Sequence, residues 1–158
     1  MASKRAGEAY WGEELHVPIS ADGQVTAYVW PLRILSIRGE SCGGPTIGVD
    51  VGNEEVLRFD CHANLGHWHT GGYDRLGTPG NSHVDFPEGI TSVGEQVAWS
   101  LRHLRDKVGE LLTQSEQEDA AQKVESYLLE TGLINLRNHI EKNAYLRDRA
   151  ISENVIGG

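Results

Sequence analysis

The spacing of apolar residues changes near residue 92, and this change constrains the fold more than any other feature of the chain. Up to about residue 74, short segments alternate apolar and polar residues, which is the period of β-strands. From Ser92 onward the apolar residues recur every three or four positions, which is the period of helices packed on one face. Strands followed by helices predict an α+β fold, with an antiparallel sheet of four or five strands over residues 14–74 and about three helices over residues 92–149 packed on one face.

Turn and capping signals divide the helical half further. Capping boxes at residues 92–95 (Ser-Val-Gly-Glu) and 115–118 (Ser-Glu-Gln-Glu) predict the starts of two helices. The first helix is expected to run to about Thr113 and the second to stop at Gly132. A third helix is predicted over residues 133–149.

Prolines and glycines in the N-terminal half indicate where strands lie at a sheet edge, bend or end. Residues 14–20 read as a strand, and Pro18 places that strand at an edge of the sheet. Residues 24–38 are rich in β-formers, and Pro31 predicts an edge, a bulge or a break among them. The run Ser-Cys-Gly-Gly-Pro at residues 41–45 is predicted to be a loop.

The composition limits the classes of function. A chain of 158 residues is predicted to form one domain, residues 1–158, with a substantial apolar core. Its net charge of −9 argues against a broad nucleic-acid surface, although a local site for nucleic acid stays open. Cys42 and Cys61 are predicted to be reduced thiols, and the sequence contains no apolar run of membrane-span or signal-peptide length. A cytoplasmic protein without a membrane partner is therefore expected.

Chemically versatile side chains concentrate in residues 57–86, which hold four of the seven histidines. Residues 57–62 and 66–70 read as the two strands of a hairpin, with a turn centred on residues 64–65. This turn would place His62 opposite His67 and Asp60 opposite His69. Because directly opposed residues share a face, five polar residues would lie on one exposed face: Arg58, Asp60, His62, His67 and His69. Phe59, Cys61 and Trp68 would face the core.

That polar face is compatible with three kinds of site. His67 and His69 can bind one metal ion, with His83 or His62 as a third nitrogen ligand. Alternatively, Asp60 orients His69 for acid–base chemistry, with Arg58 or Arg75 holding an anion. The third interpretation is a solvated polar face without chemistry.

Three short motifs carry a resemblance to known families: Arg58-Phe59-Asp60, His67-Trp68-His69 and Asp85-Phe86-Pro87. Together with the flanking residues they resemble an uncharacterised bacterial family with an LRFDCH…GHWH…GGYD core, over residues 28–112. More distantly, the hairpin and the helix after it resemble the TumE-type toxins of toxin–antitoxin pairs. Residues from 133 onward depart from the toxin pattern.

These observations lead to three functional hypotheses. In the first, the protein is a toxin-like or defence-associated nuclease, with His69 as general base, Asp60 as its orienter, His67 as acid and Arg58 as the phosphate-binding group. In the second, it is a non-catalytic interaction module that binds a protein partner, either an antitoxin or the product of a neighbouring gene in an operon. In the third, it is a metal-dependent enzyme that uses zinc, iron or manganese bound by His67, His69 and His83.

Overall fold

The computed structural model describes residues 8–71 and 83–158 of the chain. Within them the strands are β1 (Ala9–Trp11), β2 (Leu15–Pro18), β3 (Val25–Ile37), β4 (Glu40–Val51), β5 (Glu54–Asp60), β6 (His67–His69) and β7 (His83–Val84). The helices are α1 (Val93–Gln114), α2 (Glu118–Lys123), α3 (Ser126–Lys142) and α4 (Tyr145–Ser152). A short 3-10 turn, Ala63–Leu65, joins β5 to β6.

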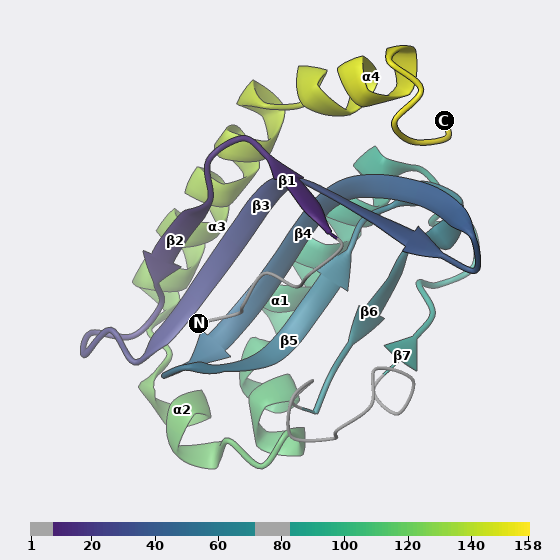
Figure 1. Cartoon of the computed structure of the whole chain (residues 1–158). Coiled ribbons are helices and arrows are strands. Elements are labelled where there is room, and N and C mark those ends of the chain that lie inside the picture. The colour runs from purple at the N-terminus through teal and green to yellow at the C-terminus, as the bar shows by residue number, and fades with distance from the viewer. Residues whose placement is uncertain (1–7, 72–82) are drawn as a thin grey trace.

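The strands form one antiparallel sheet, and the long helices α1 and α3 cover one of its faces (Figure 1). The strand order is β1-β3-β4-β5-β6-β7, and β2 also pairs with β3. The predicted α+β class is confirmed, although the described sheet has seven strands rather than four or five. β1 and β7 were not predicted, because strands of three and two residues are too short to show an alternation of apolar and polar residues.

The sheet bends where the prolines lie. The β3–β4 pairing shifts register between Trp30 and Arg33, which confirms the irregularity predicted at Pro31. The loop predicted at residues 41–45 is wrong, because these residues belong to β4. Their glycines are needed for close approach: a Cβ on Gly44 would lie 2.0 Å from the Cys61 carbonyl oxygen. Residues 41–45 therefore have a loop-like composition because the strand needs glycines at the sharp bend of the sheet.

Beyond this bend, β3 and β4 continue as a hairpin that curves away from the rest of the sheet (Figure 1). We call residues 32–44 the arm. Leu32 and Ile34, on one face of the arm, pack against Leu146 and Ala150 of α4. Because side chains alternate along a strand, Arg33, Leu35 and Ile37 lie on the opposite face. α4 thus holds the arm in place from behind.

The predicted helix boundaries need three corrections. The third predicted helix, residues 133–149, is not continuous, because α3 begins earlier, at Ser126, and ends at Lys142 before α4 begins at Tyr145. The capping box of Ser92 and Glu95 is present and begins α1. Ser115 instead ends α1, and its hydroxyl donates to the Leu111 carbonyl, so the second predicted capping box does not form. Gly132 does not stop a helix. It lies inside α3, where a Cβ would meet Val17 of β2 at 3.0 Å, so this glycine permits close helix–sheet packing.

The two faces of the sheet have different chemistry. Most of the apolar core lies between the sheet and the helices, and includes Val29, Leu57, Phe59, Leu104 and Leu136. The opposite face carries the aromatic rings of Tyr28 and Trp30, and the charged side chains described below. Trp68 faces the helices and stacks on Phe59, with ring centroids 5.2 Å apart, as its predicted core position requires.

Both cysteines are free and buried, which confirms the predicted reduced state. Burial raises the pKa of the Cys42 thiol to about 11 and that of Cys61 still further, so neither is an activated nucleophile at neutral pH. Among the described helices, none combines the length and the hydropathy needed to cross a membrane.

A buried glutamine of α1 fixes the turn between β5 and β6. The Gln96 side chain accepts a hydrogen bond from the Ala63 amide at 3.0 Å and donates to the Ala63 carbonyl at 2.8 Å. Ala63 has a positive φ of 62°, a conformation that alanine rarely adopts without such support. Gly66 leaves room for the Gln96 side chain, because a Cβ atom on residue 66 would lie 2.5 Å from Gln96 Oε1.

Replacing Gln96 with alanine should therefore loosen this turn. We expect Gln96→Ala to lower the free energy of unfolding by about 1–3 kcal/mol, because it leaves the half-buried Ala63 amide unpaired, whereas the Ala63 carbonyl keeps its hydrogen bond from the Gly66 amide. Urea unfolding followed by circular dichroism measures the change. Gln114→Ala, at an exposed position of the same helix, should change stability by less than about 0.5 kcal/mol. Equal effects of the two substitutions would contradict this role of Gln96.

Candidate functional site

The β5–β6 hairpin forms, but its register differs from the predicted one. Asp60 lies opposite His67, and Arg58 lies opposite His69. The predicted pairs Asp60–His69 and His62–His67 are wrong, because the 3-10 turn ends the strand pairing two residues earlier than a two-residue turn would. A shift of two residues preserves the alternation of faces. His67 and His69 therefore still share a face with Asp60.

His62 does not belong to this group. It lies in the turn rather than in β5, and its Nδ1 atom is 3.9 Å from the Cys42 sulfur. Burial lowers the pKa of His62 to about 3, so its ring is neutral at physiological pH. The predicted place of His62 on the shared polar face is therefore wrong, because the turn removes it from the strand.

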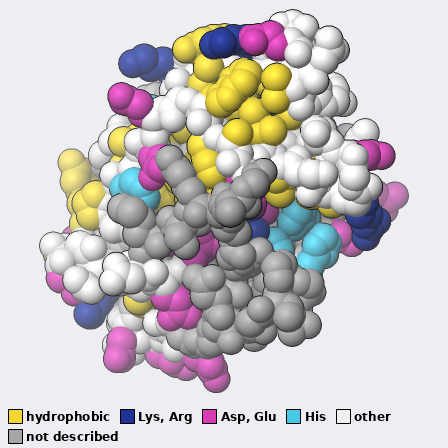
Figure 2. All heavy atoms as spheres, in the orientation of Figure 1, with side chains coloured by type: hydrophobic (Ala, Val, Ile, Leu, Met, Phe, Trp, Pro, Cys, Tyr) yellow, Lys and Arg dark blue, Asp and Glu magenta, His cyan; other side chains and the backbone are white. Residues whose placement is uncertain are grey.

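The polar residues are buried rather than exposed to solvent, contrary to the prediction. The exposed fractions are 0% for Asp60, 4% for Arg58 and 2% for His69. Figure 2 looks onto the sheet face opposite the helices, and shows histidine side chains gathered beside the centre of that face. The arm accounts for this burial, because its residues Arg33, Leu35 and Ile37 line a pocket together with the β5–β6 hairpin.

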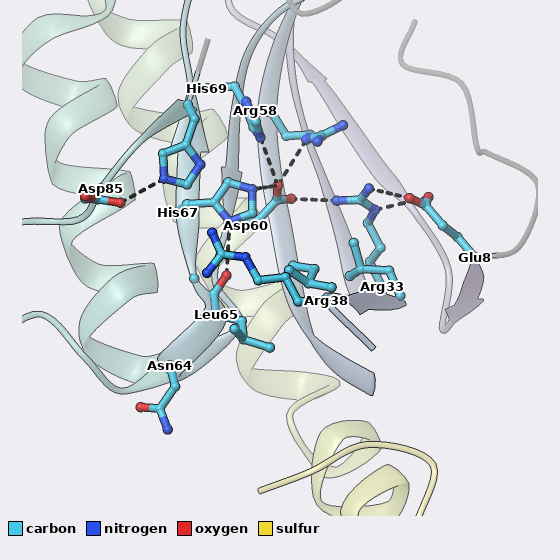
Figure 3. A pocket seen from close by; sticks show the side chains of 14 residues that line it. Glu8, Arg33, Arg38, Arg58, Asp60, Asn64, Leu65, His67, His69 and Asp85 are labelled. Carbon is cyan, nitrogen blue, oxygen red and sulfur yellow. Dashed lines mark hydrogen bonds and ion pairs between the residues drawn. The ribbon is translucent and has the colours of Figure 1, made fainter. Parts of the chain in front are cut away.

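Asp60 is the centre of the polar cluster (Figure 3). Its Oδ1 atom accepts hydrogen bonds from Arg33 Nη1 at 2.9 Å and from Thr46 Oγ1 at 3.0 Å. Its Oδ2 atom accepts from Arg58 Nε at 3.2 Å. Burial opposes ionisation of this carboxyl group, but the charges of Arg58 and Arg33 outweigh it and hold the pKa of Asp60 well below its usual value. Asp60 is therefore a carboxylate throughout the physiological range.

The two arginines continue into a chain of alternating charges. Arg33 also binds Glu8, with an Nη2–Oε1 distance of 2.5 Å. On the other side, Arg58 Nη1 lies 3.4 Å from Glu55, whose second oxygen accepts a hydrogen bond from Tyr28 at 2.9 Å. Burial raises the pKa of Glu55 to about 7, despite the nearby Arg58. The arginines thus balance the charges of Glu8 and Asp60, whereas Glu55 is only partly ionised near neutral pH.

Both histidines of β6 direct the same ring atom at Asp60 (Figure 3). The Nε2 atoms of His67 and His69 lie 3.4 Å and 3.7 Å from Asp60 Oδ2. The other nitrogen of His67, Nδ1, lies 3.0 Å from the Leu65 carbonyl oxygen. A carbonyl only accepts, so Nδ1 carries the proton and donates it. Burial lowers the pKa of His69 to about 3, which keeps its ring neutral.

Asp60, His67 and His69 are grouped as metal ligands would be. Their candidate ligand atoms all lie within 4.8 Å of one another. The sequence predicted His83 as the third member, but the structure brings in Asp60. The His83 ring stacks on His67 at 4.8 Å between centroids, and its Nε2 atom lies 2.8 Å from the Asp85 carboxylate.

The pocket in front of these three residues has a volume of about 450 Å³. Volumes of this size are typical of small-molecule sites. Its walls are of two kinds. The polar wall holds Asp60 and the histidines, and the other holds Leu35, Ile37 and Leu65, with Arg38 beside them.

The residues that surround Asp60 and line the pocket were largely not predicted from the sequence: Arg33, Thr46, Glu8, Glu55, Leu35, Ile37, Arg38 and Leu65. The sequence did contain a signal for Arg33, because it is the one charged residue in the apolar run at residues 29–35 (Val-Trp-Pro-Leu-Arg-Ile-Leu). A charged side chain in a buried strand needs an oppositely charged or hydrogen-bonding partner. Thr46 and Glu8 carried no such signal. Arg75, the predicted alternative anion-binding group, lies outside the described residues, as does Asp74 at the predicted end of the sheet.

Comparison with known families places the chain in one of them. Residues 23–140 match the family described as a domain of unknown function, DUF7700, and the chain belongs to this family. The matched segment extends from β3 to α3 and contains Asp60, His67 and His69. No curated protein matches the chain, and no solved structure does. Membership of an uncharacterised domain family, as predicted, is thus confirmed, whereas the resemblance to TumE-type toxins stays a prediction.

Removing one arginine from Asp60 should be costly. Arg33→Met would leave Asp60 and Glu8 buried with fewer charge partners, and we expect the free energy of unfolding to fall by about 3–5 kcal/mol. Arg105→Met, which breaks an exposed pair with Asp106, should cost about 1 kcal/mol or less. Chemical denaturation of both variants gives the comparison. An Arg33 variant as stable as the Arg105 variant would show that the buried pairs do not support the fold.

Glu55 should give the folded protein a pH-dependent penalty. Its pKa is raised on folding from its ordinary value of 4.5 to about 7. The contribution of Glu55 to stability is therefore greatest below pH 4.5 and is lost as the pH rises through 7. We expect Glu55→Gln, which cannot ionise, to gain stability relative to the wild type over this interval. Unfolding free energies at pH 5, 6, 7 and 8 test this, and a constant difference between the two proteins would contradict it.

Proposed function

We propose that the protein is a metal-dependent enzyme in which Asp60, His67 and His69 bind one divalent transition-metal ion. The observation that carries this proposal is the direction of the His67 ring. Its Nδ1 atom donates to Leu65, so a neutral ring presents the Nε2 lone pair to Asp60 Oδ2 at 3.4 Å. Two lone pairs that face each other at this distance repel, and a cation between them would convert the repulsion into attraction.

A metal ion suits this arrangement better than a proton. A proton shared by His67 and Asp60 would serve only two of the three converging atoms, whereas a metal ion accepts lone pairs from all three. Bonds from a metal to nitrogen or oxygen are about 2.0–2.2 Å long, so ligand atoms of one centre lie about 3.0–3.5 Å apart. The separations from Asp60 Oδ2, 3.4 Å and 3.7 Å, are close to this range. The three ligand atoms together lie within 4.8 Å of one another, so the two imidazoles would move closer together to bind one ion.

The residues around the proposed ligands match the surroundings of known metal sites. A ligating histidine usually donates its other N–H to a carbonyl or carboxylate, as His67 does to Leu65. A ligating carboxylate is usually held by hydrogen bonds, as Asp60 is by Arg33 and Thr46. Two imidazoles and a carboxylate suit zinc, iron and manganese.

The proposed chemistry is hydrolysis. Three protein ligands leave coordination positions open toward the pocket, and a metal ion there supplies a Lewis acid and an activated water. The chain holds the ion with three buried or half-buried side chains and presents it to a volume that suits a small substrate.

The acid–base nuclease predicted from the sequence has less support from the geometry. Both ring nitrogens of His67 are engaged, by Leu65 and by Asp60, which leaves no nitrogen to act as the acid. Arg58 is engaged with Asp60 and Glu55 rather than directed at a substrate phosphate. The nuclease, the antitoxin or operon partner and the interaction module stay predictions.

Metal analysis of histidine variants tests the proposal. We expect purified, untagged wild-type protein to contain close to one zinc, iron or manganese ion per chain by mass spectrometry, and a His67→Ala/His69→Ala variant to contain almost none. His139→Ala, outside the pocket, should retain the metal. His83→Ala should also retain it, because Asp60 takes the third position in the proposed set. Circular dichroism of each variant confirms that the fold is intact.

Contrary outcomes are equally specific. Wild-type protein that binds none of the three metals, even when each is added, would refute the metal centre. Loss of metal in His83→Ala would restore the ligand set predicted from the sequence. Hydrolysis of p-nitrophenyl esters and phosphodiesters, with and without metal, tests the reaction class, and activity independent of metal would refute the metal-dependent mechanism.

A further inference from the structure

The wall of the pocket that faces the metal ligands is apolar, and the proposed centre does not use it. Leu35 and Ile37 come from the arm and Leu65 from the 3-10 turn, and all three side chains are only partly buried. Aliphatic side chains left partly exposed beside a charged cluster gain free energy when a ligand covers them. A ligand composed only of polar groups would leave this wall uncovered.

The apolar wall is held in position before any ligand arrives. Leu32 and Ile34, on the other face of the arm, pack against α4. Arg147 of α4 donates a hydrogen bond to the Gly43 carbonyl at 2.9 Å, and the Gly157 amide donates to the Ser41 carbonyl at 3.2 Å. Both strands of the arm are therefore anchored, so covering the wall would cost little ordering entropy.

The polar side of the pocket favours negative charge. Arg33 and Arg58 balance Glu8 and Asp60, so a bound divalent ion would outweigh the charges of Asp85 and of the partly ionised Glu55. Arg38 adds another positive charge to the lining, and its guanidinium makes no ion pair with a described residue. The net charge of −9 on the whole chain gives no long-range attraction for anions, so recognition must come from contacts inside the pocket.

From these observations we infer that the substrate is a small amphipathic anion, whose anionic group lies toward the metal and Arg38 and whose apolar chain lies along Leu35, Ile37 and Leu65. The anionic group is a carboxylate or a phosphate. The position of the anionic group rests partly on the proposed metal centre, whereas the apolar wall and Arg38 do not depend on it. Arg38 and Gly39 are the two central residues of the turn between β3 and β4, and both have positive φ angles, of 53° and 81°, as in a type I′ turn.

A series of ligands of increasing chain length tests the inference. Acetate, butyrate and hexanoate are titrated by calorimetry into the zinc-loaded full chain and into the metal-free chain, beside hexyl phosphate and hexylammonium. We expect affinity to rise about threefold to fourfold for each added methylene group that the pocket buries. Hexylammonium should bind at least tenfold more weakly than hexanoate. The tighter of hexanoate and hexyl phosphate identifies the anionic group.

Variants of the arm separate the apolar wall from the anionic contact. Leu35→Ala/Ile37→Ala should abolish most of the dependence on chain length and leave acetate binding unchanged. Arg38→Ala should weaken all the anions by a similar factor. Ser36→Ala, at an exposed position of the same strand, is the matched control and should behave like the wild type. Thermal unfolding of each variant confirms that the arm is still folded.

The outcomes distinguish this inference from the metal centre. If none of zinc, iron and manganese binds but hexanoate binding still depends on chain length, the metal centre is refuted and the amphipathic pocket stands. If zinc binds but affinity is independent of chain length, or hexylammonium binds as well as hexanoate, the inference is overturned and the metal centre stands. Loss of hexanoate binding in Ser36→Ala as large as in the double variant would also overturn it.

Discussion

The arrangement of the site depends on the burial of one charge, the carboxylate of Asp60. A carboxylate removed from water carries a large free-energy cost unless charged and hydrogen-bonding partners replace the solvent. Arg33 from β3, Thr46 from β4 and Arg58 from β5 provide those partners. Because the partners come from three adjacent strands, the carboxylate can ionise in the interior only when these strands are correctly aligned.

The arm connects this charge cluster to the rest of the fold. Arg33 reaches Asp60 from the first residues beyond the bend, and the same strand then turns Leu35 and Ile37 toward the pocket. The alternate residues, Leu32 and Ile34, face α4. Because side chains alternate along β3, one face of this strand packs against α4 and the other face lines the pocket. The distant C-terminal helix thus helps to set the position of the pocket.

The parts of this structure that follow from local periodicity could be predicted from the sequence. The change from strand to helix spacing gave the α+β class, and the Ser92 capping box gave the start of α1. The faces of His67, His69 and Trp68 were predicted correctly because a register error of two residues leaves every side chain on its own face. Each of these properties depends on neighbours within a few positions along the chain.

The parts that depend on contacts distant in the sequence could not be predicted. The hairpin register follows from a turn that Gln96 stabilises from 33 residues away. The burial of the polar face follows from a bend at Pro31 and from an arm that returns over the hairpin. Gly132 and Gly44 resembled a helix stop and a loop, because sequence alone does not show that a neighbouring chain approaches them closely.

The charge balance around Asp60 also bears on the role of a bound metal ion. At a structural zinc site the ligands are rarely assembled without the metal, so metal binding supplies much of the folding free energy. Here Arg33, Arg58 and Thr46 already satisfy Asp60, and the Leu65 carbonyl already orients His67. The fold therefore does not need the ion to stabilise the carboxylate. The same arginines draw negative charge away from Asp60, so the carboxylate would hold a metal ion more weakly and leave that ion more electrophilic. A centre that is preformed, electrophilic and open to a pocket has the properties of a catalytic metal site rather than a structural one.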